Sequence, residues 1–220
     1  MNKKEINKIN WIFYILIFVL IFSIAFVIRG YFNTHYIYTG PSGDFKFDVI
    51  NVANVKVNLV HVFIISGGKE LDYRLTFRNN PNNLEDIDVD ISADLQETII
   101  KNNVYLTQDP GLPNLTNGES TIAMIELGRI TGTAYYSIYK IPTINAITKK
   151  SEGGGELGIP IVSCKNVTKI ISVVEFRSGE DTKVYEENGC IIVQGKDGTE
   201  LIRAADRLTF TLLGVMEKYY

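Results

Sequence analysis

Histidine and cysteine are both scarce in this sequence, with two residues of each among 220. His35 and His61 are separated from each other and from both cysteines, so the ligand spacing of a zinc site is missing. Neither histidine has a nucleophile or a metal partner at the spacing of a Ser/His/Asp, Cys/His or HExxH site. The sequence therefore predicts no catalytic residue, no metal site and no cofactor.

An excess of charge of one sign is also lacking. The 22 basic and 25 acidic residues give a formal net charge of −3. The basic residues are scattered and do not form a patch with interleaved aromatic residues, which argues against a nucleic-acid partner. With 45% hydrophobic and 21% charged residues, the chain can bury a core. Its length suits one anchor plus one ordinary domain, or two small domains.

The most conspicuous feature is an uncharged apolar run over residues 11–28, with the sequence WIFYILIFVLIFSIAFVI. As an α-helix it would be roughly 27 Å long, close to the thickness of the hydrocarbon core of a bilayer. Trp11 and Tyr14 at one end, and Tyr31 and Phe32 beyond the other, suit the two interfacial belts. We therefore expect a transmembrane helix at 11–28, with the lipid bilayer as its partner.

The flanks of this run predict its orientation. Lys3, Lys4 and Lys8 precede it, whereas Arg29 alone follows it closely. The positive-inside rule then makes residues 1–10 cytoplasmic and the C-terminal domain extracytoplasmic, which is a single-pass signal-anchor arrangement in the cell membrane. One alternative is a cleaved signal peptide, but Ser23-Ile24-Ala25 is a poor cleavage site and lies inside the run rather than after it. The other alternative is a buried helix of a soluble protein. Such a helix normally has a polar face, and this run has none.

Residues 36–91 read as a β-rich, membrane-proximal region. Apolar and polar residues alternate through 54–65 with both faces partly apolar, which is typical of a central strand. The segment 66–70 forms a turn, and 71–77 alternates as a one-sided strand, so together they predict a hairpin. Residues 40–44 form an earlier turn that leads into a strand over 45–50.

Residues 92–220 have an α/β pattern and form either one domain with 36–91 or a second unit. We expect a short helix capped by Ser92 and ending near Lys101, and a longer helix from about Ser120 to Ile130. The fold class is α+β: an N-terminal transmembrane helix, a β-meander, and a mixed α/β portion that ends in a strand-turn-helix unit. The expected strands are 104–107, 134–141, 159–163, 167–176, 183–185 and 190–194.

The strand-turn-helix unit has the clearest local signals. The strand 190–194 is followed by the turn 195–198 and by apolar residues at helical spacing to about Leu213. Asp197 and Glu200 have the spacing of a capping box, and Gly214 is placed to end the helix. A Gly-rich turn at a helix start can also bind phosphate. Capping is favoured because the Walker spacing is absent and Asp197 would repel an anion.

Cys164 and Cys190 are a candidate disulfide. On the exterior side of a membrane an even pair of cysteines is normally oxidised. Closing a loop of this length would contribute about 3.5 kcal/mol in the chain-entropy model. The alternative is a pair of buried free thiols.

An acidic run and two sequons are weaker signals. Glu85, Asp86, Asp88 and Asp90 could place aligned carboxylates on one strand face for Ca²⁺. The EF-hand glycine and distal glutamate are missing, so a solvated strand face is favoured. Candidate glycosylation sites are Asn114 and Asn166, each in an Asn-X-Thr sequence.

Two stretches, 77–87 (FRNNPNNLEDI) and 190–208 (CIIVQGKDGTELIRAADRL), have a familiar pattern. They resemble uncharacterised single-pass membrane-anchored envelope proteins of small-genome archaea. The second is also similar to strand-turn-helix units of prokaryotic cell-envelope domains. The resemblance covers about a fifth of the chain. It implies an envelope setting and brings no activity or catalytic residues.

The sequence leaves three possible functions. The first is a non-catalytic binding or structural role in the cell envelope, with an envelope protein or glycan as partner. The second is an accessory subunit of a membrane protein complex, in which the anchor makes the contacts. The third is a carboxylate-dependent envelope hydrolase, whose acids, from 85–90 or from Asp109 and Glu126, would converge only in the fold.

Overall fold

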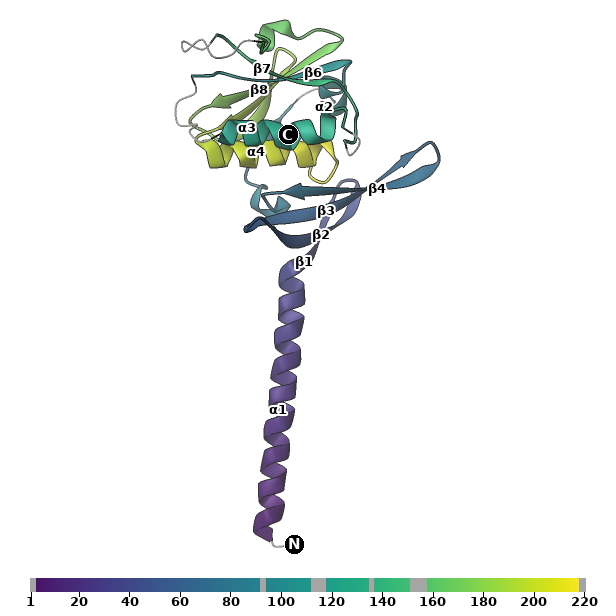
Figure 1. Ribbon diagram of the computed structural model, residues 1–220, viewed down its shortest axis with the longest axis vertical. Coiled ribbons are helices and arrows are strands. Elements are labelled where there is room, and N and C mark those ends of the chain that lie inside the picture. Colours follow the sequence, from purple (N-terminus) through teal and green to yellow (C-terminus); the bar gives the residue numbers. More distant parts are fainter. Residues whose placement is uncertain (1–2, 92–93, 112–117, 135–136, 151–157, 218–220) are drawn as a thin grey trace.

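The computed structural model describes residues 3–91, 94–111, 118–134, 137–150 and 158–217. A long N-terminal helix leads into a four-stranded sheet, and a pair of helices separates this sheet from a larger six-stranded sheet (Figure 1). The fold class is α+β, as the sequence indicates.

Helix α1 (Lys3–Thr34) is 32 residues long, or about 48 Å. Its apolar window, Phe13–Phe32, has a mean hydropathy of 2.5, and none of it is buried in the protein. The helix stands apart from the folded part of the chain (Figure 1). It passes into the first strand without a linker, and the ring of His35 stacks on Tyr31 with 4.3 Å between ring centroids. The first sheet therefore begins where the apolar helix ends.

The four-stranded sheet is an antiparallel meander with the strand order β1-β2-β3-β4. Its inner face carries Phe47, Val60, Leu75 and Phe77, which are all buried. The opposite face is turned away from the helix pair and is largely exposed. The predicted hairpin of 54–65 with 71–77 is confirmed as β3 and β4. The strands are β1 (His35–Gly40), β2 (Gly43–Val52), β3 (Val55–Ser66) and β4 (Lys69–Phe77).

The six-stranded sheet is mixed, with the order β5-β9-β10-β8-β6-β7. Strands β7, β6, β8 and β10 are parallel, whereas β9 runs antiparallel to β10. Asn188 and Gly189 have φ angles of 54° and 77°, which suit the two-residue turn joining β9 to β10. The strands are β5 (Asp88–Asp90), β6 (Asn103–Gln108), β7 (Thr143–Ile147), β8 (Ile171–Ser178), β9 (Lys183–Glu187) and β10 (Cys190–Gly195).

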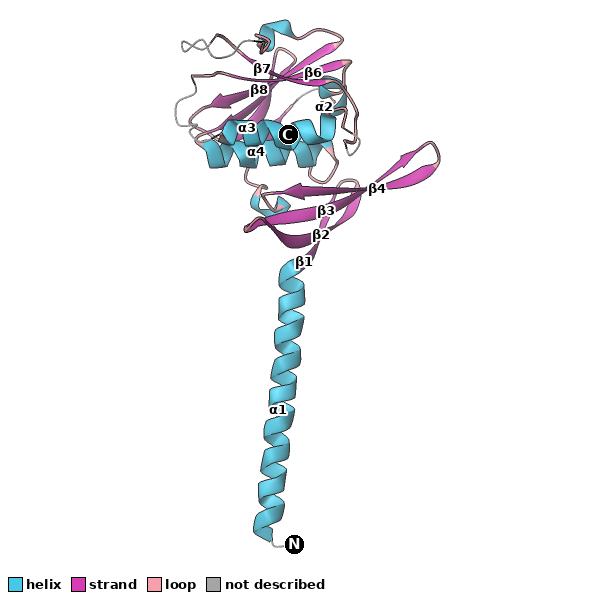
Figure 2. Cartoon of the chain, viewed as in Figure 1, coloured by secondary structure: helices cyan, strands magenta, loops and turns pink. Residues whose placement is uncertain are grey.

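Helices α3 (Glu119–Thr131) and α4 (Gly198–Leu212) lie between the two sheets (Figure 2). The short helix α2 (Leu95–Ile99) lies at the edge of this layer. Phe210 of α4 is fully buried, with its ring centroid 4.3 Å from that of Phe77 and 5.9 Å from that of Phe47. The same apolar cluster continues through α3 and α4 into β8 and β10. One core therefore joins the meander to the larger sheet.

The C-terminal unit forms as predicted. Asp197 is the N-cap of α4, and its Oδ1 accepts a hydrogen bond of 2.9 Å from the backbone N–H of Glu200. Gly214 follows the helix with φ 72°, a conformation that favours glycine. Its carbonyl accepts a hydrogen bond from the backbone N–H of Ser42, so the end of α4 is tied to the β1–β2 turn.

The strand predicted over 134–141 is wrong. The described part of this segment has no strand, and β7 begins only after Pro142. Instead the backbone N–H groups of Ile138 and Ile141 donate to the carbonyls of Ile130 and Thr131 at the end of α3. The backbone of the segment is therefore bonded to the end of α3, while its apolar side chains Ile138, Tyr139 and Ile141 pack on the main core.

Three other predicted boundaries differ. β8 begins at Ile171 because the hydroxyl of Thr168 accepts hydrogen bonds from the backbone of Ile170 and Ile171, which forms a turn. The segment 159–163 contributes only an isolated bridge between Ile161 and β7. Asp94 caps α2, and Ser92 lies outside the described residues.

Candidate functional site

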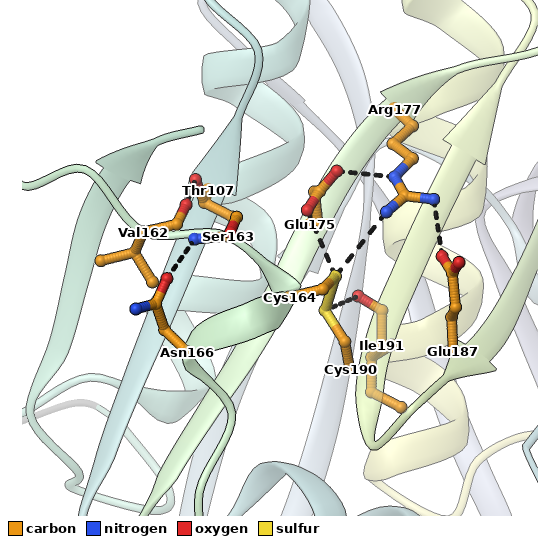
Figure 3. Close-up of a disulfide and its surroundings, with 10 residues drawn as sticks. All are labelled: Thr107, Val162, Ser163, Cys164, Asn166, Glu175, Arg177, Glu187, Cys190 and Ile191. Carbon is orange, nitrogen blue, oxygen red and sulfur yellow. Dashed lines mark hydrogen bonds and ion pairs between the residues drawn. A yellow bond between two sulfur atoms is a disulfide. The ribbon is translucent and has the colours of Figure 1, made fainter. Parts of the chain in front are cut away.

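Cys164 and Cys190 form a disulfide, which confirms the predicted pairing (Figure 3). Their Cα atoms are 5.2 Å apart, within the usual range for a disulfide. Cys190 begins the central strand β10 and is fully buried, whereas Cys164 is half-buried. The bond therefore fixes a surface segment to the middle of the six-stranded sheet.

That surface segment includes the 3₁₀ turn η2 (Cys164–Asn166). It covers the face of the six-stranded sheet that is turned away from α3 and α4, where a small second core gathers. A sheet with parallel strands needs cover on both faces, and on this side the described residues contain only the short 3₁₀ turn η2 and no α-helix (Figure 1). The disulfide therefore holds the cover that a helix would otherwise supply. The buried residues of this core are Ala146, Val162, Val173, Cys190 and Ile192.

Three charged side chains surround the disulfide (Figure 3). Glu175 and Arg177 project from β8, and Glu187 ends β9. Arg177 Nε donates to Glu175 Oε1 at 2.6 Å, and Arg177 Nη1 donates to Glu187 Oε2 at 2.8 Å. Glu175 Oε2 and Arg177 Nη2 lie 3.2 Å and 3.7 Å from Cys164 Sγ. The bridge is thus enclosed by an ion-pair network at the edge of a cavity of about 380 Å³.

The ion-pair network keeps a charged guanidinium beside the bridge. Partial burial acts to lower the pKa of Arg177, but the hydrogen bonds with Glu175 and Glu187 raise it above its ordinary range. The two sulfur atoms and a Glu175 oxygen lie within 4.8 Å of one another, which is the spacing of three metal ligands. Sulfur binds metals as a thiolate. The formed disulfide therefore removes two of these ligands.

Removing the disulfide should destabilise the protein strongly. Replacing both cysteines, as Cys164→Ala with Cys190→Ala, should lower the free energy of unfolding by about 3.5 kcal/mol, because the unfolded chain regains the freedom of the closed loop. Urea unfolding of the full chain in detergent measures this loss. A reductant should destabilise the natural chain by a similar amount and leave the double variant unchanged. An equal effect of reductant on both would contradict the account.

The acidic run does not gather into one cation site. Asp88 and Asp90 are exposed on β5, but Asp86 precedes the strand and pairs with Arg203 Nη2 at 2.7 Å. Glu85 lies on another side and accepts a hydrogen bond from the hydroxyl of Tyr38. The cavity of about 480 Å³ beside Asp86 and Asp88 is lined by lysine and arginine as well as by acids. The favoured interpretation, a solvated strand face, agrees with this arrangement.

The turn before α4 is an equally poor anion site. Asp197 occupies the N-cap, and the side chain of Glu119 from α3 packs against Gly198 so closely that a Cβ atom there would lie 2.4 Å from its carboxyl group. Glu200 adds a third carboxylate in the first turn. Negative side chains occupy the helix end that a phosphate would need.

The structure describes one of the two sequons, that of Asn166. Asn166 is exposed at the end of η2, and its Oδ1 accepts a hydrogen bond of 2.9 Å from the backbone N–H of Ser163. A glycan on this side chain would have to retain or replace that bond. Asn114 lies outside the described residues.

The carboxylates proposed for a hydrolase have separate partners. Asp109 pairs with Lys149 at 2.9 Å. Partial burial acts to raise its pKa, but the hydrogen bonds from Lys149 and Gly111 leave the pKa of Asp109 lowered. Glu126 pairs with Arg129 at 2.6 Å within α3. Burial raises the pKa of Glu126 despite that cation.

Asp206 is a buried acid that the sequence analysis did not single out. It lies on α4 with no exposed surface, and its Oδ2 accepts hydrogen bonds from the backbone and side chain of Asn79, at 3.0 Å and 2.8 Å. Burial, with a further contribution from Glu126, raises the pKa of Asp206 to about 8. Asp206 has no exposed surface, and Glu126 is 8% exposed. Asp206 is therefore buried as a core residue, and its carboxyl group is not accessible to a substrate.

Two patterns in the sequence are signals for Asp206 and for the pair Glu175 and Arg177, although the sequence analysis did not use them. Asp206 occurs four residues after Ile202 and four before Phe210, so it shares the buried stripe of its helix. Glu175 and Arg177 alternate with Val174 and Phe176, which places both charges on one face of β8.

Comparison with known proteins gives no relative. A scan against protein-family models, a search of curated proteins and a search of solved structures each found no match.

Proposed function

We propose that the chain is a single-pass, membrane-anchored protein of the cell envelope, with a cytoplasmic N-terminus and a non-catalytic extracytoplasmic domain that binds an envelope protein or glycan. The observation that carries the proposal is the combination of an exposed apolar helix with a disulfide in the same chain. The helix is long enough to cross a bilayer, and disulfides persist in oxidising compartments.

A groove supports the binding role. A cavity of about 490 Å³ lies between β3 of the meander and the end of α4, with a mostly apolar lining and a few polar groups. Binding sites for small ligands and peptide side chains commonly have this character. The lining includes Phe45, Val62, Ile64, Tyr139 and Leu213.

Capture of partners from detergent extract tests the binding role. The full chain, crosslinked in the membrane and then purified, should retain an envelope protein or glycan. A variant with an arginine in the groove, Ile64→Arg, should lose it, because Ile64 lines the groove and is only half-buried. Recovery of no envelope component by the natural chain would contradict the proposal.

Exchange of the anchor separates this role from that of an accessory subunit of a membrane complex. In the exchanged chain an unrelated apolar helix of the same length replaces residues 11–28. If the exterior domain makes the contacts, the partner is still captured. If the exchange abolishes capture while the Ile64→Arg variant keeps it, α1 makes the contacts and the accessory-subunit function is the correct one.

A further inference from the structure

Strand β4 forms one edge of the meander, and its register fixes which backbone groups face outward. Gly67 and Gly68, with φ angles of 58° and 74°, make a two-residue turn closed by the pair Ser66 and Lys69. The closing pair of such a turn exchanges hydrogen bonds, and hydrogen-bonded pairs then alternate along the hairpin. Asp72 and Arg74 therefore point their backbone N–H and C=O groups away from β3.

A contact from α3 agrees with this direction. Thr76 lies two residues after Arg74, so its backbone groups also point away from β3. Its carbonyl accepts a hydrogen bond from Arg129 Nη2 on this outer side of β4. Arg129 thus occupies the edge at the C-terminal end of the strand. Among the described residues, the outward backbone groups of Glu70, Asp72 and Arg74 have no hydrogen-bond partner. An edge of this kind is a template for another strand.

The side chains of β4 are complementary to a second copy of themselves. In an antiparallel pair centred on Tyr73, Asp72 lies opposite Arg74 of the second copy, and the reverse contact follows by symmetry. The outer face then carries two pairs of opposite charge. On the inner face Leu71 meets Leu75, and the two Tyr73 side chains meet each other.

Other registers place like charges in contact. A pair centred on Asp72 would bring the two Asp72 carboxylates together, and one centred on Arg74 would bring the two guanidinium groups together. A pair centred on Leu71 would place Glu70 opposite Asp72. One centred on Leu75 would need the Thr76 carbonyl, which Arg129 occupies. In the register centred on Tyr73 the ladder runs over residues 71–75 and ends before Thr76. We propose that β4 pairs antiparallel with β4 of a second copy in the register centred on Tyr73, which joins two meanders into one continuous sheet.

Membrane anchoring would strengthen this contact. A short ladder between edge strands is weak in dilute solution, but two copies confined to one bilayer have a high effective concentration. This part of the inference rests on the proposed anchoring through α1. The strand pairing itself rests only on the register and charges of β4.

Cysteine crosslinking of the full chain in lipid vesicles tests the pairing. In the proposed register Tyr73 faces Tyr73 across a pair without hydrogen bonds, with about 4.5 Å between Cα atoms, which suits a disulfide. Tyr73→Cys should therefore form a covalent dimer under mild oxidation, at least tenfold faster than Thr39→Cys on the opposite edge strand β1. Equal rates for the two variants would overturn the proposal.

A charge exchange tests the register. In the Tyr73→Cys chain, adding Asp72→Arg or Arg74→Asp should each slow crosslinking about tenfold, and adding both should restore it. Lys46→Asp, on the outer face of β2, should have no effect. Failure of the double exchange to restore crosslinking would contradict the register.

Flotation of the same vesicles keeps the two proposals distinguishable. A chain that floats with the lipid but does not crosslink contradicts the pairing and leaves the anchoring intact. A chain that does not float contradicts the anchoring, and its crosslinking in solution still reports on β4.

Discussion

Replacing Phe210 with alanine should lower the free energy of unfolding by about 3 to 5 kcal/mol. The ring is fully buried in α4 and contacts Phe47 and Phe77 of the meander. Loss of the ring leaves a cavity where the helix layer meets the four-stranded sheet. The cost should therefore appear in both parts of the domain at once.

Urea unfolding of the full chain in detergent measures this effect. Phe63→Ala provides a matched control, because Phe63 is 59% exposed on the outer side of β3 and should change stability by less than about 0.5 kcal/mol. Fluorescence and circular dichroism should give the same midpoint for Phe210→Ala. Separate midpoints would show that the two sheets unfold independently, and a cost below about 1 kcal/mol would show that this contact does not hold them together.

The pH dependence of stability should be dominated by Asp206. The native carboxyl group keeps its proton to about pH 8, whereas in the unfolded chain it loses the proton near pH 4. Between these values the native state binds more protons than the unfolded state, so stability falls as the pH rises through this window. The contribution is fully present below about pH 4 and is lost above about pH 8. Glu126 acts in the same direction, since its pKa is also raised.

The variant Asp206→Asn isolates this effect. Asparagine has the shape and the hydrogen-bonding pattern of the protonated acid and cannot ionise, so its carbonyl can still accept both bonds from Asn79. At pH 8 the variant should be more stable than the natural chain by on the order of a few kcal/mol. Its unfolding free energy should vary much less between pH 5 and pH 8.

An exposed acid provides the comparison for this experiment. Asp181 has a side chain that is 75% exposed, so Asp181→Asn should leave the pH profile of the natural chain nearly unchanged. If Asp206→Asn also leaves the profile unchanged, or destabilises the chain at pH 8, a charged Asp206 is accommodated in the core and the account of its burial is wrong.

The parts of the fold that the sequence predicts correctly depend on local signals. Asp197 is a capping residue immediately before an amphipathic run, so it defines the start of α4 without knowledge of the rest of the chain. The double glycine at 67–68 likewise defines the β3–β4 turn. The apolar run 11–28 is recognised by its length and its lack of charge, which suit only a membrane or a core, and it lies within α1.

The parts that the sequence does not predict depend on distant contacts. β5 lies next to the meander in sequence, yet it pairs with β9 almost a hundred residues later. The apolar pattern before Pro142 resembles a strand because an irregular segment whose side chains pack on the core needs the same residue types. Glu175, Arg177 and Glu187 come together only because β8 and β9 flank the same central strand.

The side of the membrane on which the domain lies can be measured directly. A membrane-impermeant maleimide can be added to intact cells that express Ile65→Cys, at a site that is 80% exposed, or Lys4→Cys, which precedes the apolar run 11–28. The native cysteines are joined to each other and do not react. We expect labelling of Ile65→Cys in intact cells and of Lys4→Cys only after lysis. The reverse pattern would place the domain in the cytoplasm and contradict the proposed function.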